Sequence, residues 1–392
     1  MMMKIGEVFC LIRNGASIKQ SDGASGIPIT RIETISNRTV DRNKFGYANI
    51  ANAAEYQDYL LQDGDILMSH INSEKHLGKT ALYRKYSGEQ IIHGMNLLLL
   101  RPNAEILLAD YAMYILNSEM FLRQLPRITK KSVNQASFNI SALKELDVYV
   151  PSINRQKEIV SVLDKVDAML ERYKTQFKRL DDLVKSRFVE MFGEPETNPY
   201  GWRKTTVGDV CSSVVRGPFG SALKKEFFVE PNGSTYKVYE QKHAIQKSAT
   251  IGTYYISAEK FGELRRFECR SGDILMSCSG TMGELFQLPS GCERGVINQA
   301  LCKFTLSDCI LPIVFLTYMR QTIGNLETKG SGIQNIAAVS YVKAMPINLP
   351  PMEVQRRFAA FVAEVDKSKL AVQQSLEKLE TLKKSLMQQY FG

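Results

Sequence analysis

The hexapeptide "GDILMS" occurs twice in this chain, at 64–69 and again at 272–277. A short apolar run behind a Gly-Asp turn is typical of a β-strand, so a single copy would indicate little more. Two identical copies in distant parts of one chain indicate an internal repeat, and a repeat determines the domain organisation.

The repeat extends over the whole chain. The stretch "IGEVFCLIRNG" at 5–15 aligns with "VGDVCSSVVRG" at 207–217, and "ISALKELDVYVP" at 140–151 aligns with "VSYVKAMPINLP" at 339–350. From there the alignment runs to the end without a gap, and it pairs Pro151 with Pro350, Gln156 with Gln355, and Gly193 with Gly392. Because a helix of fixed length requires such constant spacing, we interpret the chain as a tandem duplication that ends each repeat with a helix.

Each half has the same plan, a strand-rich module followed by one long helix. Short apolar runs such as "GIPITRI" and "IIHGMNLLLLRP" are broken by Gly, Pro and Asn, whereas "LADYAMYILNSEMFLRQL" has the apolar spacing of a helix. These patterns predict an α+β fold with two mixed α/β modules. The predicted boundaries are 1–150 for the first module, 151–193 for its helix, 194–205 for a linker, 206–349 for the second module and 350–392 for the second helix.

Apolar residues recur in both terminal helices at alternating steps of four and three. This 3.5-residue period, kept over about four heptads, is the pattern of a coiled-coil seam. Arg187, Lys369 and Lys383 interrupt it. The predicted seam comprises Ile159, Leu163, Val166, Leu170, Tyr173, Phe177, Leu180, Val184, Phe358, Val362, Val365, Val372, Leu376, Leu379 and Leu386.

The natural partner of each long helix is its own duplicate, which has the same length. Each helix leaves its module in the same sense, so a pseudo-two-fold pairing makes the two helices antiparallel and separates the two modules. The alternative is two unrelated surface helices, each packed on its own module.

Composition excludes several classes of protein. An apolar content of 44% and a charged content of 23% over 392 residues are typical of a soluble globular chain. No apolar stretch is long enough for a membrane span, and the N-terminus lacks the pattern of a signal peptide, so we expect a cytoplasmic protein without a membrane partner. Seven cysteines without a Cys-x-x-Cys pair favour neither a disulfide framework nor a zinc site. The net charge of +9 permits a polyanionic partner without requiring one.

The duplicated motifs carry a family resemblance. Two modules with "GDIL" strands, each followed by "S-x-L/V-K", then "P-x-x-x-x-Q" and a long helix ending in "K-S-…-F-G", resemble the specificity subunit of type I restriction-modification systems. The resemblance covers essentially the whole chain, in the order recognition domain, helix, recognition domain, helix.

The resemblance implies a DNA-reading subunit without catalysis of its own. Each target-recognition domain would read one half of a bipartite site in double-stranded DNA, and the coiled coil would set the spacer. Two modification subunits would dock on the scaffold and methylate adenine with S-adenosylmethionine, and restriction subunits with motor and nuclease activity can join them. The modules differ outside the shared motifs, so we expect two different half-site sequences.

Fragments that imitate catalytic motifs do not complete them. "SEKHLGKT" at 73–80 ends like a phosphate-binding loop, but Ser73 stands where the first glycine should be. "NPYG" at 198–201 lacks the second proline of the amino-methyltransferase motif. The four histidines show no metal-ligand spacing, and no Ser/His/Asp set can be argued. We therefore predict no catalytic residue, no metal and no cofactor in this chain.

Polar loops remain as candidates for DNA contacts. Phosphates favour Lys and Arg, whereas base edges favour side chains that both donate and accept hydrogen bonds. The segment after each "GDILM" supplies Ser69, His70, Asn72, Lys75 and Lys79, then Ser277, Ser279 and Thr281. Loops before each long helix supply Arg127, Lys130, Lys131, Asn134 and Gln135, then Lys329, Gln334 and Asn335, and "RGPFGSALKKE" adds Arg216, Lys224 and Lys225. For any one of them, an ordinary solvated loop stays the alternative.

Two other functions stay open at this point. One is a self-contained DNA methyltransferase or nuclease. Against it, the sequence lacks the Gly-rich strand-to-helix turn that holds S-adenosylmethionine. A coiled-coil scaffold that binds only proteins would show no salt-sensitive DNA binding in its complex.

Overall fold

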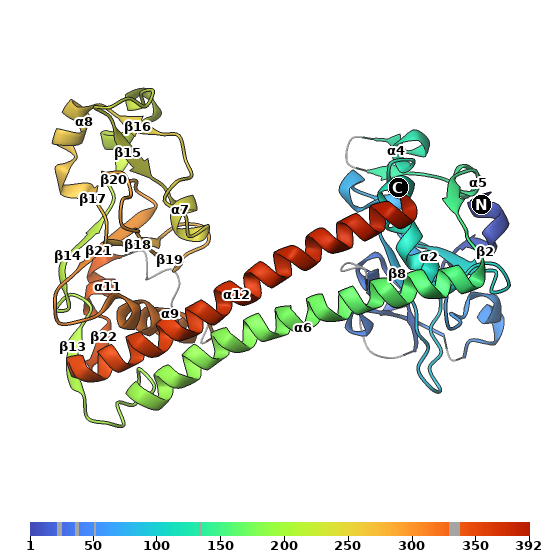
Figure 1. The fold of residues 1–392 in the computed structure, drawn as a ribbon, viewed down its shortest axis with the longest axis horizontal. Helices are drawn as coiled ribbons and strands as arrows, with labels where there is room; N and C mark the ends of the chain where they lie inside the picture. Colours follow the sequence, from blue (N-terminus) through green and yellow to red (C-terminus); the bar gives the residue numbers. More distant parts are fainter. Residues whose placement is uncertain (22–25, 36–38, 51, 133–134, 329–337) are drawn as a thin grey trace. The chain divides into compact units, whose positions relative to one another are not determined.

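The chain forms two compact units, which we describe separately. This computed structural model describes residues 1–21, 26–35, 39–50, 52–132, 135–328 and 338–392. Unit 1 comprises 1–175 together with 373–392, and unit 2 comprises 176–372 (Figure 1). The long helices α6 (Ile153–Phe192) and α12 (Met352–Phe391) each contribute one part to either unit.

Both units are built on the same four-stranded antiparallel sheet. In unit 1 the strand order is β2 (Phe9–Asn14), β9 (Leu98–Pro102), β6 (Ile66–Met68) and β8 (Thr80–Leu82). In unit 2 it is β14 (Cys211–Arg216), β21 (Leu301–Leu306), β18 (Ile274–Ser277) and β19 (Leu285–Gln287). The two "GDILMS" copies supply the equivalent interior strands β6 and β18, so the predicted duplication is confirmed at the level of topology.

The first two residues of the hexapeptide explain why it is repeated. Gly64 and Gly272 have φ of +84° and +87°, a left-handed conformation that favours glycine. The buried Asp65 carboxylate accepts a hydrogen bond of 2.7 Å from the Gln62 amide and two, of 2.7 and 2.8 Å, from the Arg101 guanidinium. Each turn is thus closed by a buried carboxylate.

Unit 2 closes the equivalent turn with the same chemistry. Asp273 accepts from the Arg270 amide at 3.0 Å and from the Thr305 hydroxyl at 2.5 Å. Thr305, on β21, occupies the strand position that Arg101 has on β9, and the ammonium of Lys303, two residues earlier on that strand, lies 3.8 Å from the same carboxylate. The carboxylate therefore ties the turn to the neighbouring strand in both units.

The units differ in the sheets that they add to this frame. Unit 1 adds a three-stranded sheet in the order β3 (Gln20–Ser21), β5 (Gly46–Ala48) and β4 (Ile27–Ile29). Unit 2 adds a four-stranded sheet in the order β16 (Tyr255–Ile256), β15 (Tyr236–Tyr239), β20 (Gly295–Ile297) and β17 (Glu268–Cys269), in which β15 and β20 are parallel. The shared frame therefore carries two different peripheries, as the poor sequence match outside the motifs predicts.

A buried glutamine joins each long helix to its own unit. The Gln156 side chain accepts from the Leu108 amide at 2.9 Å and donates to the carbonyls of Ile106 and Pro151 at 2.7 and 2.9 Å. This contact fixes the start of α6 against the start of α2 (Ala109–Leu116).

In unit 2, Gln355 makes the same three contacts with Leu311, Cys309 and Pro350, at 2.8, 3.0 and 2.9 Å. These contacts fix α12 against α9 (Pro312–Thr328). These contacts explain why the "P-x-x-x-x-Q" motif occurs in both halves.

The two long helices pair in an antiparallel sense within each unit. In unit 1, Arg155 lies 5.7 Å from the Tyr390 ring and Asp167 binds Lys383. As residue numbers rise along α6, those of their partners on α12 fall.

The pairing continues in unit 2 in the same sense. The Lys369 ammonium lies 2.6 Å from Asp181, and Arg187 lies 5.6 Å from the Phe361 ring. All three residues that interrupt the seam therefore contact the opposite helix.

The predicted seam positions face the interior. Ile159, Leu163, Val166, Leu170 and Val184 of α6 are buried, as are Phe358, Val362, Val365, Val372 and Leu376 of α12, and the remaining five are half-buried. Phe188 was missed because the charged Arg187 precedes it. Its ring is fully buried and packs on Phe192 and Phe358, at centroid distances of 4.7 and 5.5 Å.

One predicted helix is divided. The pattern at 108–125 predicts a single helix, but the structure has α2 and then α3 (Glu119–Leu122). Ser118 separates them, because its hydroxyl accepts from the Phe121 amide at 3.3 Å and so caps a new helix. The predicted linker is also shorter, since β13 (Arg203–Thr206) begins within 194–205 and pairs with β22 (Pro346–Leu349).

The remaining elements complete the two units. In unit 1 they are β1 (Met2–Lys4), α1 (Ile5–Val8), η1 (Ile32–Ile35), η2 (Arg42–Lys44), η3 (Ala54–Tyr59), α4 (Leu125–Ile128), α5 (Ile140–Lys144) and β12 (Asp147–Tyr149). In unit 2 they are η5 (Gly220–Leu223), η6 (Lys225–Phe227), α8 (Ala258–Glu263), η7 (Arg265–Phe267) and α11 (Val339–Ala344). Within the described ranges, no helix is apolar over a length that would cross a bilayer.

Candidate nucleic-acid interface

Two loops that are distant in the sequence of unit 1 converge on one small sheet. Its strand order is β10 (Lys130–Lys131), β11 (Ala136–Ser137) and β7 (Ile71–Asn72). Ser137 lies opposite both Ile71 and Lys130, and the Phe138 amide donates to the His70 carbonyl at 3.2 Å. The structure therefore joins the segment after the first "GDILM" to the loop before α6, which the sequence identified as two separate candidates for DNA contact.

Cations lie along this sheet. Lys75 and Lys130 are exposed, and Lys79 is half-buried. Lys75 belongs to the 3-10 helix η4 (Glu74–His76), and Lys131 lies 2.8 Å from the Glu74 carboxylate. The surface thus offers ammonium groups that could meet DNA phosphates, with one of them held by an ion pair.

A cavity of about 420 Å³ opens beside the sheet. Its polar lining consists of Asn14, His70, Lys130, Ser137 and Asn139, and Ile71, Ile128, Phe138 and Ile140 form its apolar side. The His70 ring is 5% exposed, and its Nδ1 has no hydrogen-bond partner. Burial lowers the pKa of His70 to about 4, because it disfavours the charged imidazolium.

A neutral imidazole suits this cavity to one kind of ligand. At neutral pH one ring nitrogen of His70 is a donor and the other an acceptor, as a base edge requires. A phosphate would instead need cations, and Lys130 at the cavity's edge is one. The cavity therefore offers His70 to a base edge and Lys130 to a phosphate.

Other predicted residues of unit 1 have supporting places. Ser69 is buried, and its hydroxyl accepts from the Asn72 amide group at 3.4 Å. Gln135 is exposed, and its carbonyl accepts from the Ser132 hydroxyl at 2.9 Å. Arg127 lies on α4 and lines a different cavity from His70. These contacts shape the loops, whereas Lys75 and Lys130 are exposed and His70 lines the cavity.

In unit 2, a buried network holds the loop between β18 and β19. Ser277 is fully buried, and its hydroxyl donates to the Thr281 carbonyl at 2.6 Å and accepts from the Glu284 amide at 2.9 Å. Gln241, on α7 (Gln241–Ile245), donates its side-chain amide to the carbonyls of Ser279 and Thr281. Sequence reasoning missed Gln241, which lies far from this loop in the chain. Ser277 thus orders the loop, in which the predicted Ser279 is half-buried and the predicted Thr281 is exposed.

Unit 2 also presents an aromatic side chain beside a guanidinium. Arg216, at the end of β14, donates to the Gln299 carbonyl at 3.3 Å and lies 5.2 Å from the Phe219 ring. Phe219 is 68% exposed, a fraction that is uncommon for such an apolar ring. Lys224 lies 3.6 Å from Glu226, and Lys225 is exposed. Asn134, Lys329, Gln334 and Asn335 lie outside the described residues.

The described surfaces supply donors, acceptors and positive charge. In the part of the chain that the structure covers, no three side chains of His, Cys, Asp or Glu gather as metal ligands would. The arrangement can bind a polyanion and contact bases through these groups.

The chain matches the family described as "Type I restriction modification DNA specificity domain" over residues 1–179 and 199–382. It is similar to the putative type I restriction enzyme MjaX specificity subunit of Methanocaldococcus jannaschii, with 29% identity over 98% of this chain and 91% of that protein. It is also similar to the type I restriction enzyme EcoKI specificity subunit of Escherichia coli K12, with 24% identity over 46% of this chain and 40% of that protein.

Solved structures have the same fold. One comes from a study of complex assembly and conformational transition of the type I R-M system, with a TM-score of 0.59 and 16% identity over 99% of this chain and 96% of that chain. Another is the type I restriction-modification S subunit from M. genitalium, with a TM-score of 0.51 and 14% identity over 100% and 96% of the two chains. The chain therefore belongs to the DNA specificity family of type I restriction-modification systems, as a specificity subunit without catalysis of its own.

Proposed function

We propose that each unit reads one half of a bipartite site in double-stranded DNA. The observation that carries this proposal is the convergence of two candidate loops on the sheet β10–β11–β7 of unit 1, beside the cavity that contains His70. The duplicated frame supports a second reading unit. Its different periphery supports a second half-site with a different sequence.

Within unit 1, phosphates and bases are contacted by different residues. Lys75 and Lys130 neutralise phosphates, which contributes affinity that falls as salt rises. His70 contacts a base edge from its cavity, because its neutral ring can donate and accept. In unit 2, the exposed Phe219 and Thr281 are the corresponding candidates.

The long helices set the unread spacer, and the scaffold docks two modification subunits. These partners bind S-adenosylmethionine and methylate adenine in each half-site, and restriction subunits join them for cleavage. The duplication supports two docking positions, because each unit presents the same frame and the same glutamine-anchored helix start.

The test is methylation mapping on random-sequence DNA with the reconstituted complex. Lys75→Ala and Lys130→Ala should each weaken binding with little change in the site, and should reduce the slope of log K against log salt by about 1. Lys85→Ala is the control. This substitution removes the same charge from an exposed lysine that follows the other end of β8. Methylation without any sequence preference by the wild-type complex would contradict the proposal.

His70→Asn tests base reading by unit 1. The shorter amide keeps a donor and an acceptor but moves them, so one base position in one half-site should change while the other half-site stays the same. If both half-sites stayed unchanged in this variant, His70 would not contact a base. The proposal that each unit reads one half-site would still stand.

A further inference from the structure

The segment after each "GDILM" forms a loop whose base is closed in the same way in both units. In unit 1 the Gly78 amide donates to the Ser69 carbonyl at 2.8 Å, and in unit 2 the Gly283 amide donates to the Ser277 carbonyl at 2.8 Å. Residues 70–77 lie inside the first contact and residues 278–282 inside the second, so the loop of unit 1 is the longer one. The two loops also differ in the elements that hold them.

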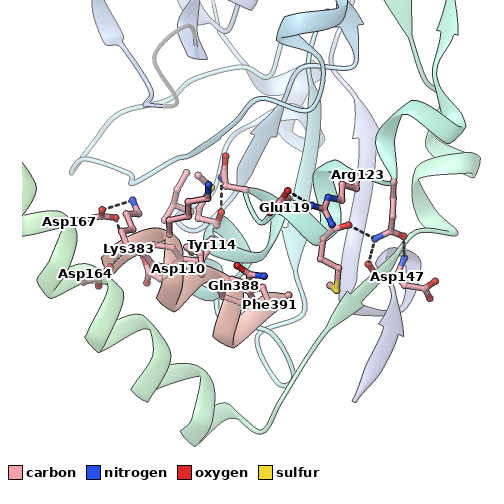
Figure 2. A pocket seen from close by; sticks show the side chains of 18 of the residues that line it. Asp110, Tyr114, Glu119, Arg123, Asp147, Asp164, Asp167, Lys383, Gln388 and Phe391 are labelled. Atoms are coloured by element: carbon pink, nitrogen blue, oxygen red, sulfur yellow. Dashed lines mark hydrogen bonds and ion pairs between the residues drawn. The ribbon is translucent and has the colours of Figure 1, made fainter. Parts of the chain in front are cut away.

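In unit 1, elements that follow the loop in the chain hold it. Strand β7 is part of the loop and pairs with β11. Gly78 lies against Leu122 of α3 and Leu125 of α4. Figure 2 shows Glu119 and Arg123, the ion pair that spans α3 beside the neighbouring cavity. The support of this loop therefore comes from the segment between the loop and residue 137.

In unit 2, an element that precedes the loop in the chain holds it. Helix α7 lies between β15 and β16, two strands of the sheet that unit 2 adds to the shared frame. Gln241, at its start, donates its side-chain amide to the Ser279 carbonyl and, at 3.3 Å, to the Thr281 carbonyl. The Ser277 hydroxyl donates to the same Thr281 carbonyl at 2.6 Å. The tip of the loop is therefore fixed by donors from two different elements.

A lysine just beyond α7 holds the far end of the loop. The Lys247 ammonium binds the Glu284 carboxylate and donates to the Leu285 carbonyl at 2.9 Å. The backbone of Lys247 has φ of +52°, a left-handed conformation that is rare for a residue with a side chain. Glycine would suit this backbone better but would lack the ammonium. The contribution of Lys247 therefore lies in its side-chain contacts with the loop.

Helix α7 is itself held in place by a buried histidine. The Nδ1 atom of His243 accepts from the Glu240 amide at 2.9 Å, and its Nε2–H donates to the Ile251 carbonyl at 2.7 Å. These two contacts assign the neutral tautomer with its proton on Nε2. Burial lowers the pKa of His243, so the ring stays neutral at neutral pH. The helix is therefore a fixed support for the loop.

We propose that Gln241 and Lys247 are positioning residues for base reading by unit 2. They fix the loop so that Thr281, whose side chain is exposed while Cys278 is buried and Ser279 is half-buried, contacts a base edge. A threonine hydroxyl can donate or accept there, and its methyl group can contact the methyl group of thymine. This inference rests on the proposed function, and it makes one half-site depend on residues that act through the loop instead of contacting DNA.

The test is methylation mapping on random-sequence DNA with the reconstituted complex, together with the Tm of each purified variant. Thr281→Val identifies the base position that the loop reads. Gln241→Met and Lys247→Gly should each lower the preference at that position at least about threefold, because a hydrogen bond that orients the loop is lost. The other half-site should stay the same. Gln246→Met is the control, since this side chain at the end of α7 is exposed, and it should change neither half-site.

Lys247→Gly separates positioning from stability. Glycine accepts the left-handed backbone, so the Tm should not fall although the base preference does. Lys247→Arg keeps a cation at this position and should keep the wild-type preference. If Gln241→Met and Lys247→Gly kept every base preference while Thr281→Val altered one, the inference would be wrong and reading by unit 2 would stand. Equal loss of preference in both half-sites, with a lower Tm, would also overturn it, because the contacts would then be structural only.

Discussion

Replacing Gln156 by methionine should loosen the start of α6 from unit 1. Methionine keeps the unbranched shape and loses both polar atoms, so the Leu108 amide and the carbonyls of Ile106 and Pro151 remain buried without this partner. Each unsatisfied group costs about 1–3 kcal/mol. Because the backbone can relax partly, we expect a loss of roughly 2–5 kcal/mol in the stability of unit 1.

The repeat supplies an internal replicate. Gln355→Met removes the same three contacts in unit 2, so it should cost unit 2 a similar amount. Hydrogen exchange read by mass spectrometry distinguishes the units, because amides of α2 and the first turns of α6 report on unit 1. Amides of α9 and the first turns of α12 report on unit 2.

Each variant should lose protection mainly in its own unit. Gln176→Met is the control, because that side chain is exposed and its replacement should change stability by less than about 0.5 kcal/mol. If Gln156→Met retained wild-type protection in α2 and α6, the glutamine would not be the joint that we describe.

Four further predictions follow from the same contacts. Seven residues inserted after Thr175 in α6 and after Val372 in α12 add about 10 Å to each helix and should lengthen the unread spacer by up to about three base pairs without changing either half-site; methylation mapping that finds an unchanged spacer would show that the helices do not set it. A circular permutant that joins Gly392 to Met1 through "EPETNPYGW" and opens within 194–201 should fold and keep its target site, and failure of several linker lengths would contradict the equivalence of the two halves. Arg42, then the Tyr86 amide and the Tyr83 hydroxyl, lower the pKa of Glu89 to about 2, so the stability advantage of the wild type over Glu89→Gln should be full above the unfolded-state pKa of about 4.5 and disappear as the pH falls toward 2; urea unfolding at pH 6 and pH 3 measures it. The purified chain alone should methylate no DNA, and activity should appear only on adding modification subunits, so tritium transfer from S-adenosylmethionine by the isolated chain would refute the assignment.

The repeat and the seam could be predicted because both depend on sequence period alone. A coiled-coil seam buries whatever lies at its 3.5-residue spacing, so Leu163 or Val365 needs no knowledge of the rest of the fold. Phe188 was not predicted, because the neighbouring Arg187 breaks the pattern. The Arg187 guanidinium lies over the Phe361 ring and leaves the seam intact.

The candidate site was predictable only in parts. The segments that contain His70 and Lys130 could be named from their polar composition, but their convergence depends on the pairing of strands two residues long. Such short strands have no periodic signal of their own. Burial was equally hidden, since Ser277 has the composition of a loop residue and lies in the core.

The two lysines of the seam restrict how the long helices can slide. Lys383 binds Asp167 and Lys369 binds Asp181, and the two aspartates lie on either side of Lys174 in α6. A slip of one heptad in one direction would bring Lys383 to Lys174, and a slip in the other direction would bring Lys369 there.

Either slip therefore places two ammonium groups next to each other and breaks both ion pairs. The apolar seam positions would still face apolar positions of the other helix. A translation of about 10 Å, which the heptad pattern alone would tolerate, thus carries an electrostatic cost in both directions. The five charged residues therefore favour one register of the paired helices over its heptad-shifted alternatives.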